Sequence, residues 1–484
     1  MIIKTNKDEI LDFSHDASNF SGNPEAVFFP ETILELQELV KTLYQENTCF
    51  TISGNRTGLT GGAAAEKGII ISTSKLNKII EINRNDKYII TEAGVTLEEI
   101  QRTAAENGLL YPPDPTETNC FIGGTIATNA SGEKSFKYGA TRNFVEELEI
   151  LLPQGELIQI KRNHFFANNL KIKILNYDLT LPKFDMPEVK NTAGYYCAPD
   201  MDIIDLFIGA EGTLGIITKA KLRLVDKPGK LISCFVFFNN EEDALQFITD
   251  VKRKSLLSIH TNDFTRLNAL AIEFMDKNSI SLLKDNPLIP HNRAAAVWFE
   301  QETTTEYEDL ILNRLWELLS KYNVDDNSIL YAVDDNEIKS LKELRHSFPS
   351  KVNEYISAHN LKKLGTDTAV PSGSFRAYYK FCKDCVEINN LQYVIYGHFG
   401  NSHIHLNILP KDEKEYNLGK EIYNQICLKA VELGGTISAE HGIGKFKRDL
   451  LIKMYGEEIV NQMKNIKQVL DPKMLLNSGN IFLP

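Results

Sequence analysis

Three histidines close together, and a Glu-His pair further along the chain, are the residues best suited to chemistry. His398, His403 and His405 fall within eight residues, and Glu440-His441 stands between glycine-rich turns. Imidazole and carboxylate groups with an open coordination position form sites for Zn²⁺ or Mn²⁺, and such an ion activates a bound oxygen. One histidine on a strand is usually structural. Three of them with a Glu-His pair predict a divalent metal site.

The residues around these histidines indicate how they are positioned. Gly397 and Gly400 favour a turn, after which polar and apolar residues alternate over 403–408, as in a strand with one polar face and one buried face. If the segment 440–442 is extended, the side chains of Glu440 and His441 diverge.

A second chemical feature is a glycine-rich loop at 53–62, which has four glycines and three hydroxyl residues in ten positions. It lies between two β-rich runs, 48–52 and 68–72, whereas Rossmann and Walker loops lead from a strand into a helix. Glycine lets the backbone approach a ligand closely, and successive N–H groups can form an anion-binding concavity. The loop therefore predicts a diphosphate cradle of another kind.

Five separated motifs extend this picture. They are the loop 53–62, the segment 111–139 with Ile122-Gly123-Gly124, the segment 207–218, the histidine turn 397–405 and the segment 438–444. In this order and spacing the chain resembles the FAD-linked 2-hydroxy acid dehydrogenases of the vanillyl-alcohol oxidase/PCMH flavoprotein superfamily, which include D-lactate and D-2-hydroxyglutarate dehydrogenases and the glycolate oxidase FAD subunit. The resemblance runs from about Val27 to the C-terminus.

The resemblance implies an α+β fold: a PCMH-type FAD-binding domain of two α/β subdomains, an antiparallel-sheet substrate cap, and C-terminal helices. It implies non-covalent FAD, because the first loop lacks the histidine that tethers the flavin in some relatives. The expected cofactor-binding residues are Gly54, Asn55, Arg56, Thr57, Gly58, Gly62, Ala63, Ile122, Gly123, Gly124, Asn129, Gly209, Glu211 and Ile217. Arg56 is equally well explained as a solvated loop cation, and Gly209, Glu211 and Ile217 are expected on a strand.

The resemblance also assigns roles at the histidines. His398, His405 and Glu440 stand at its metal-binding positions, and His441 stands at the position of the catalytic base. The usual pattern of the turn is Gly-His-x-Gly-Asp-Gly-Asn-x-His, so Asn401, Ser402 and His403 are departures, and His403 offers an extra ligand. Arg345 matches an arginine that clamps the substrate carboxylate, although a helix-surface cation explains it equally well. Lys363 is displaced from the position of a second clamp.

The composition of the chain limits which kinds of molecule it can bind. The 484 residues carry 53 Lys and Arg against 65 Asp and Glu, a net charge of −12, which makes nucleic acid an unsuitable partner. The absence of a leader or apolar span favours a cytoplasmic protein. Peripheral contact with a membrane and a homodimer are both compatible with this composition. Seven scattered cysteines suit a reducing compartment, and Cys382 and Cys385 read as two free thiols on a helix. Without an iron–sulfur motif, electrons must leave through an external acceptor: a quinone, a cytochrome, an electron-transfer flavoprotein or oxygen.

The predicted domains are 1–226 for FAD, 227–439 for the substrate cap, and 440–484 as a C-terminal segment that returns to the FAD domain. Helical spacing of apolar residues predicts a helix over 31–46, and the stretch 154–199 looks like an irregular excursion. Within the second domain the expected helices are 241–252, 305–322, 336–348 and 417–433, and the expected β runs are 231–238, 294–299 and 393–409.

The function expected is oxidation of a small D-2-hydroxy acid, D-lactate first, to the 2-oxo acid by hydride transfer to FAD. A glycolate oxidase-type subunit, which acts only within a complex, and a D-2-hydroxyglutarate dehydrogenase are the alternatives within the family. A flavin-free metallohydrolase would leave the glycine-rich loops unexplained. An ether-lipid synthase of the same superfamily would need a phosphate site that the sequence does not reveal.

Overall fold

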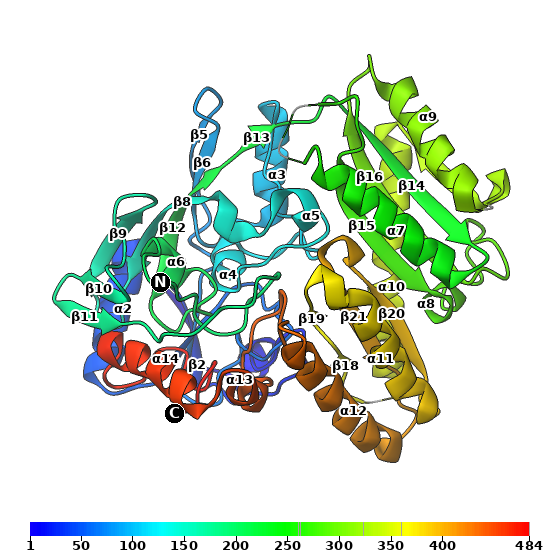
Figure 1. The fold of residues 1–484 in the computed structure, drawn as a ribbon. Coiled ribbons are helices and arrows are strands. Elements are labelled where there is room, and N and C mark those ends of the chain that lie inside the picture. The colour runs from blue at the N-terminus through cyan, green and yellow to red at the C-terminus, as the bar shows by residue number, and fades with distance from the viewer. Residues whose placement is uncertain (260, 262, 323, 360, 484) are drawn as a thin grey trace. The chain divides into compact units, whose positions relative to one another are not determined.

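Two units account for the chain in a computed structural model (Figure 1). The first unit comprises residues 1–131, 140–227 and 437–484, and the second comprises 132–139 and 228–436. The assignment of functional domains with bounds at 226 and 439 stays a prediction. The structure describes residues 1–259, 261, 263–322, 324–359 and 361–483, so Pro484, the last residue of the predicted C-terminal segment, lies outside it.

The first unit contains two main sheets. One has the order β1-β2-β4-β3, in which β2, β4 and β3 are parallel, and the other has the order β5-β6-β12-β8-β9. The glycine-rich loop joins β3 to β4, as the sequence predicts. The strands are β1 (Ile2–Lys4), β2 (Ala26–Phe29), β3 (Phe50–Ser53), β4 (Ile69–Ser72), β5 (Ile79–Asn83), β6 (Tyr88–Glu92), β7 (Leu109–Leu110), β8 (Val145–Leu151), β9 (Leu157–Lys161), β10 (Lys171–Ile174), β11 (Tyr177–Thr180), β12 (Ile216–Arg223) and β13 (Val225–Asp226).

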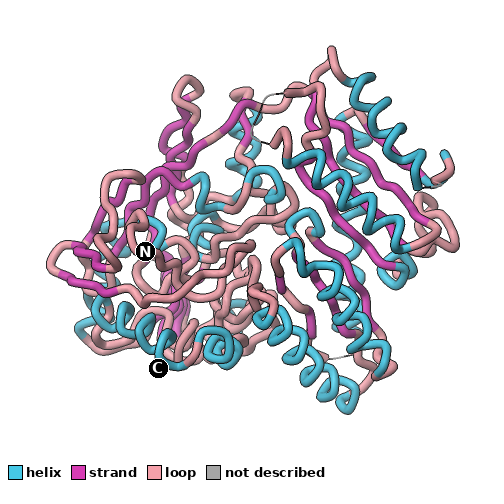
Figure 2. Tube along the Cα trace, in the orientation of Figure 1, coloured by secondary structure: helices cyan, strands magenta, loops and turns pink. Residues whose placement is uncertain are grey.

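The helix predicted at 31–46 is α2, which Thr32 caps and which buries Leu36, Leu39, Val40 and Leu43. The prediction that 154–199 is irregular is wrong in part, because β9 extends the five-stranded sheet and β10 pairs with β11 in a hairpin. Much of the first unit is nevertheless loop (Figure 2). Its α-helices are α1 (Lys7–Ile10), α2 (Ile33–Gln45), α3 (Leu97–Glu106), α4 (Ile122–Ala127), α6 (Ile204–Phe207), α13 (Arg448–Tyr455) and α14 (Glu457–Leu470).

The second unit is built on one antiparallel sheet, which confirms the predicted sheet type. Its order is β17-β14-β16-β15-β20-β21-β18, and β19 also pairs with β21. The strands are β14 (Lys230–Phe238), β15 (Ala269–Asp276), β16 (Ala295–Thr303), β17 (Ile329–Ala332), β18 (Leu364–Gly365), β19 (Thr368–Ala369), β20 (Tyr393–Gly397) and β21 (His403–Ile408).

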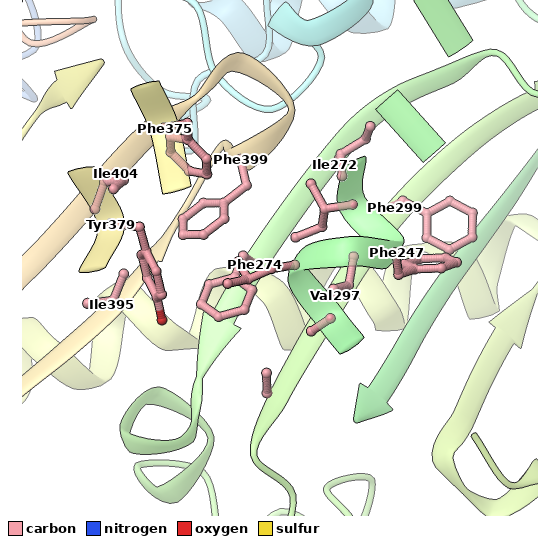
Figure 3. Close-up of a cluster of buried hydrophobic side chains, with 14 of the residues drawn as sticks. Phe247, Ile272, Phe274, Val297, Phe299, Phe375, Tyr379, Ile395, Phe399 and Ile404 are labelled. Carbon is pink, nitrogen blue, oxygen red and sulfur yellow. The ribbon is translucent and has the colours of Figure 1, made fainter. Parts of the chain in front are cut away.

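Helices cover both faces of this sheet. Alternate side chains of the strands point to opposite faces. Phe274, Val297, Phe299 and Ile404 therefore join Phe247 of α7 in one core (Figure 3), while Trp298 and Met275 join α8 and α10 in the other. The α-helices are α5 (Ser135–Tyr138), α7 (Glu241–Leu256), α8 (Lys277–Ser281), α9 (Glu308–Leu319), α10 (Asp335–Ala358), α11 (Phe375–Ile388) and α12 (Glu413–Glu432).

None of the helices in the described residues combines the length and apolar character needed to cross a bilayer. All seven cysteines are described residues, and none of them forms a disulfide within the described part of the chain. Cys382 and Cys385 lie on α11, as predicted.

Candidate active site

The histidine turn of the second unit joins β20 to β21. Gly397 ends β20 with φ +145°, and a Cβ there would lie 3.0 Å from the carbonyl oxygen of His403, so a larger residue would push the two strands apart. Phe399 follows His398 and anchors the turn in the core, where its ring stacks on Phe274 at 4.4 Å and meets the edge of Phe375 (Figure 3). Close packing against the sheet therefore holds the turn in place.

The strand after the turn has the predicted two-faced pattern, but both faces are buried. Ile404, Leu406 and Ile408 enter the core shared with α7 and α11, so His403 and His405 face the side that α10 covers. The imidazoles of His398, His403 and His405 form one group, with ring centroids 4.4 to 5.4 Å apart. One ring nitrogen of each lies within 4.8 Å of the others.

A buried ionic network lies beside this group. Glu273 on β15 contacts Nδ1 of His398 at 2.6 Å and accepts from Nη2 of Arg345 at 2.8 Å. Arg345, on α10, also lies 3.6 Å from Glu133, which contacts His346 at 2.7 Å. Burial disfavours ionised Glu273, but His398 and Arg345 outweigh it and lower the pKa of Glu273 to about 2. Burial also opposes the charge of Arg345, but Glu273 and Glu133 raise the pKa of this guanidinium above its usual range.

Two carboxylates that the sequence analysis did not assign thus hold the histidines. Glu273 orients His398, and Oδ1 of Asp367 lies 3.1 Å from Nε2 of His403, with both side chains fully buried. A sequence signal existed for the first: Glu273 interrupts the otherwise apolar run 269–275, and a carboxylate inside a buried strand needs a partner. Asp367 lies in a short loop, where sequence alone does not reveal its partner.

The residues that depart from the family pattern also have contacts within the second unit. The hydroxyl of Ser135 donates to the side-chain oxygen of Asn401 at 3.1 Å. Nζ of Lys252 donates to the hydroxyl of Ser402 at 3.0 Å, and Ser402 itself has a left-handed φ of +56°. Burial lowers the pKa of Lys252 to about 8. Lys363 donates to Asn353 at 3.2 Å.

Glu440 and His441 lie in a turn of the first unit. The hydroxyl of Ser438 donates to the carbonyl of Gly442 at 2.8 Å, so the segment is not extended. The expectation that the two side chains diverge is wrong, because Nε2 of His441 lies 3.8 Å from a carboxylate oxygen of Glu440. Glu440 also accepts from Nζ of Lys190 at 2.6 Å and from the hydroxyl of Ser131 at 3.0 Å.

The carboxylate of Glu211 fixes the end of this turn. It accepts from the backbone N–H groups of Ile443 at 2.6 Å and Gly444 at 2.7 Å. Burial raises the pKa of the Glu211 carboxyl to about 7 against the lowering effect of these donors. The structure places Gly209 and Glu211 in a turn before β12, with φ +82° and +52°, so the expectation that they lie on a strand is wrong; Ile217 does lie on β12.

The glycine-rich loop of the first unit keeps several side chains engaged with protein. The guanidinium of Arg56 stacks on the ring of Phe13 at 4.2 Å, and its backbone has a left-handed φ of +58°. The amide of Asn55 donates to the carbonyl of Asn119 at 2.9 Å, and Asn480 donates to the carbonyl of Gly62 at 2.9 Å. Main-chain groups rather than these side chains are thus what the loop has to offer an anion.

The segment around α4 fits a large cofactor. Ile122, at the start of α4, is buried, and Gly123 packs so closely that a Cβ would lie 2.7 Å from Ala93. A Cβ on Gly124 would meet no protein atom within 4 Å. Packing explains the first glycine but not the second, which is exposed and leaves space for a bound group beside it. Asn129, buried with φ +49°, accepts from the N–H of Arg142 at 2.9 Å. The cofactor contacts of all these residues stay predictions, as do those of the other loop residues, Gly54, Thr57, Gly58 and Ala63.

The second unit also fits a divalent ion, because its three imidazoles are close and their outer nitrogens are held by hydrogen-bond acceptors. The structure brings together His398, His403, His405 and Arg345 within the second unit, and Glu440, His441 and Glu211 within the first. The joining of Glu440 and His441 with the three histidines in one site stays a prediction.

Comparison with known proteins identifies the family. A model described as "FAD linked oxidases, C-terminal domain" matches residues 230–481, and one described as "FAD binding domain" matches 24–161. The chain is 28% identical to D-lactate dehydrogenase of Anaerostipes hadrus (97% of this chain, 92% of the relative), to glycolate oxidase subunit GlcD of Bacillus subtilis (98% and 92%) and to D-2-hydroxyglutarate dehydrogenase of Stutzerimonas stutzeri (99% and 96%).

A solved structure of alkyldihydroxyacetonephosphate synthase has the same fold, with a TM-score of 0.68 at 16% identity over 98% of this chain and 81% of the other. Likeness at that identity establishes the architecture alone. The C-terminal family model, which spans more than half of the chain, establishes more. The chain belongs to the FAD-linked oxidase family and is an FAD-dependent oxidoreductase of the PCMH-type fold.

Proposed function

We propose that this chain oxidises a small D-2-hydroxy acid to the corresponding 2-oxo acid, with D-lactate as the first choice of substrate. The observation that carries the proposal is the buried group of three imidazoles beside an arginine, in a chain of the FAD-linked oxidase family. The names of its relatives, D-lactate dehydrogenase, D-2-hydroxyglutarate dehydrogenase and glycolate oxidase subunit, support the same class of substrate.

Each protein group has a role in this proposal. His441 takes the proton of the 2-hydroxyl, because an imidazole can accept and release a proton near neutral pH. Arg345 holds the substrate carboxylate. Its Nε and Nη2 groups already donate to Glu273. The Nη1 group would therefore donate to the substrate carboxylate. FAD, when bound, accepts the hydride from C2.

His398, His405 and Glu440 would hold a divalent ion, Zn²⁺ or Mn²⁺, which lowers the pKa of a coordinated hydroxyl when bound. FAD would be held without a covalent bond, and an external acceptor, namely a quinone, a cytochrome or an electron-transfer flavoprotein, would take the electrons. We also propose that the protein forms a homodimer and contacts a membrane peripherally.

The test is anaerobic bleaching of the purified yellow protein by a panel of 2-hydroxy acids, with D and L forms offered separately. We expect D-lactate to reduce the flavin fastest and L-lactate to leave it oxidised. Faster reduction by D-2-hydroxyglutarate or glycolate would move the assignment to that substrate. A flavin that none of these acids reduces would refute the proposal for the chain alone. Acid precipitation should release the colour, and colour retained in the pellet would refute only the non-covalent claim.

A further inference from the structure

His403 is held in the same way as the two histidines already assigned to the metal. Nδ1 of His398 contacts a carboxylate oxygen of Glu273, Nδ1 of His405 contacts the carbonyl oxygen of Thr366 at 3.1 Å, and Nε2 of His403 contacts Asp367. Metal-binding histidines in proteins have this arrangement, in which the nitrogen remote from the ion donates to a carboxylate or a carbonyl. All of these contacts lie within the second unit.

These acceptors determine which ring nitrogen carries the proton. A carbonyl oxygen can only accept, so Nδ1 of His405 carries the proton and Nε2 carries the lone pair. Glu273 contacts Nδ1 of His398 and Asp367 contacts Nε2 of His403, so the metal-binding nitrogens would be Nε2 of His398 and Nδ1 of His403. Each ring therefore has one nitrogen that contacts an oxygen acceptor and a second nitrogen that would bind the metal ion.

The distances suit a shared ion. One nitrogen from each ring lies within 4.8 Å of the others. Zn–N distances of about 2.0–2.1 Å place the nitrogens of a tetrahedral zinc ion roughly 3.3 Å apart, so a small closure of the three rings is sufficient. Gly397 and the packed ring of Phe399 hold the turn, which limits the rearrangement to the imidazoles.

We propose that His403, oriented by Asp367, is a third imidazole ligand, and that the site consequently prefers Zn²⁺ and other imidazole-binding ions to Mn²⁺. This inference rests on the metal site of the proposed function and deepens it. The family pattern has Asn at this position, which is not one of its metal-binding positions, so His403 would add an imidazole nitrogen that the pattern lacks. Imidazole favours zinc and the later transition ions, whereas Mn²⁺ favours carboxylate, carbonyl and water oxygens. Replacing Asn by His therefore shifts the selectivity of the site.

The test counts imidazoles and measures selectivity in the flavin-loaded enzyme. Chelated protein is dialysed against equal Zn²⁺ and Mn²⁺, and the bound metals are measured by elemental analysis. Zinc-edge X-ray absorption then counts coordinated imidazoles. We expect wild type to take up zinc with three imidazoles. His403→Asn should show two imidazoles and a preference for Zn²⁺ over Mn²⁺ reduced at least about tenfold, and Asp367→Asn should keep three with zinc affinity reduced about tenfold.

His359→Asn is the matched control, because His359 is an exposed histidine of the same unit whose Nδ1 contacts the carbonyl of Tyr355. It should bind zinc as wild type does. Two imidazoles in wild type, or unchanged zinc selectivity in a folded His403→Asn variant, would overturn the inference. If wild type binds zinc through three imidazoles but no 2-hydroxy acid reduces its flavin, the proposed function is refuted and the metal site is supported. Flavin reduction in protein that binds no zinc would remove only the metal site.

Discussion

In the first unit, the turn that carries Glu440 and His441 is held through the main chain: Glu211 accepts two backbone N–H groups, and Ser438 donates to a backbone carbonyl. In the second unit, His398 and His403 are held by the side chains of Glu273 and Asp367, and His405 is held by the carbonyl of Thr366, on a sheet packed on both faces. Contacts to the main chain of the turn do not depend on the side chains of Glu440 and His441, whereas a network of side chains fails when one member is removed. The two regions should therefore respond differently to substitution.

The largest effect should come from His441→Asn. Because main-chain contacts hold the turn, we expect the variant to keep its fold, its FAD and its metal. Loss of a general base typically costs about 10²- to 10⁴-fold in rate, so flavin reduction by the best 2-hydroxy acid should slow by that factor. Anaerobic stopped-flow spectroscopy measures the rate. Reduction at the wild-type rate would exclude His441 as the base, and loss of metal would make it a ligand.

Glu273→Ala tests the side-chain network. The substitution removes the nearest carboxylate partner of Arg345, a residue that is 3% exposed, and leaves Glu133 at 3.6 Å. Breaking a buried ion pair by deleting one partner costs about 3–5 kcal/mol, so the urea midpoint should fall accordingly. Glu273→Leu combined with Arg345→Met removes both charges and should recover most of the loss. A single variant as stable as wild type would show that the network does not hold this region.

The same contrast explains what could be predicted from the sequence. Local patterns were sufficient for α2, whose apolar spacing and Thr32 cap are contiguous, and for the alternation of β21. The helix expected at 336–348 continues through Pro349 to Ala358, because burial of Val352 and Ile356 outweighs the backbone hydrogen bond that proline lacks. Glu273 and Asp367 lie far in sequence from the histidines they contact, and no local pattern encodes such pairs.

The pH dependence of stability should reveal the carboxyl group of Glu211, which contacts the main chain of the turn. The pKa of Glu211 is raised to about 7 in the folded chain, against an unperturbed value of 4.5. The folded state therefore holds a proton that the unfolded state has lost between these values, so the free energy of unfolding should fall as pH rises from 4.5 to 7. The fall is at most about 3 kcal/mol.

Glu211→Gln cannot ionise and should remove this part of the slope in urea titrations at several pH values. Asp276 in the second unit, with its pKa raised to about 6 by burial, should leave a smaller slope of the same sign. A slope in the Gln variant equal to that of wild type would mean that Glu211 is ionised throughout this range in the folded protein.

The smallest effect on stability, and the most specific test of the first unit, comes from a pair of adjacent glycines in α4. A Cβ on Gly123 would lie 2.7 Å from Ala93, so Gly123→Ala should destabilise the protein by about 1–3 kcal/mol. A Cβ on Gly124 meets no protein atom within 4 Å, and alanine favours a helix by roughly 0.5–1 kcal/mol over glycine. Without added FAD, Gly124→Ala should therefore melt at or slightly above the wild-type temperature.

If FAD occupies the space beside Gly124, the same methyl group must obstruct it. Ligand binding raises the melting temperature in proportion to the logarithm of ligand concentration over its dissociation constant, so thermal unfolding across a series of FAD concentrations separates the two effects. We expect Gly124→Ala to need at least about tenfold more FAD than wild type for the same shift, because a close-packed contact tolerates little added volume. Equal FAD dependence in the two proteins would show that the cofactor does not pass this residue.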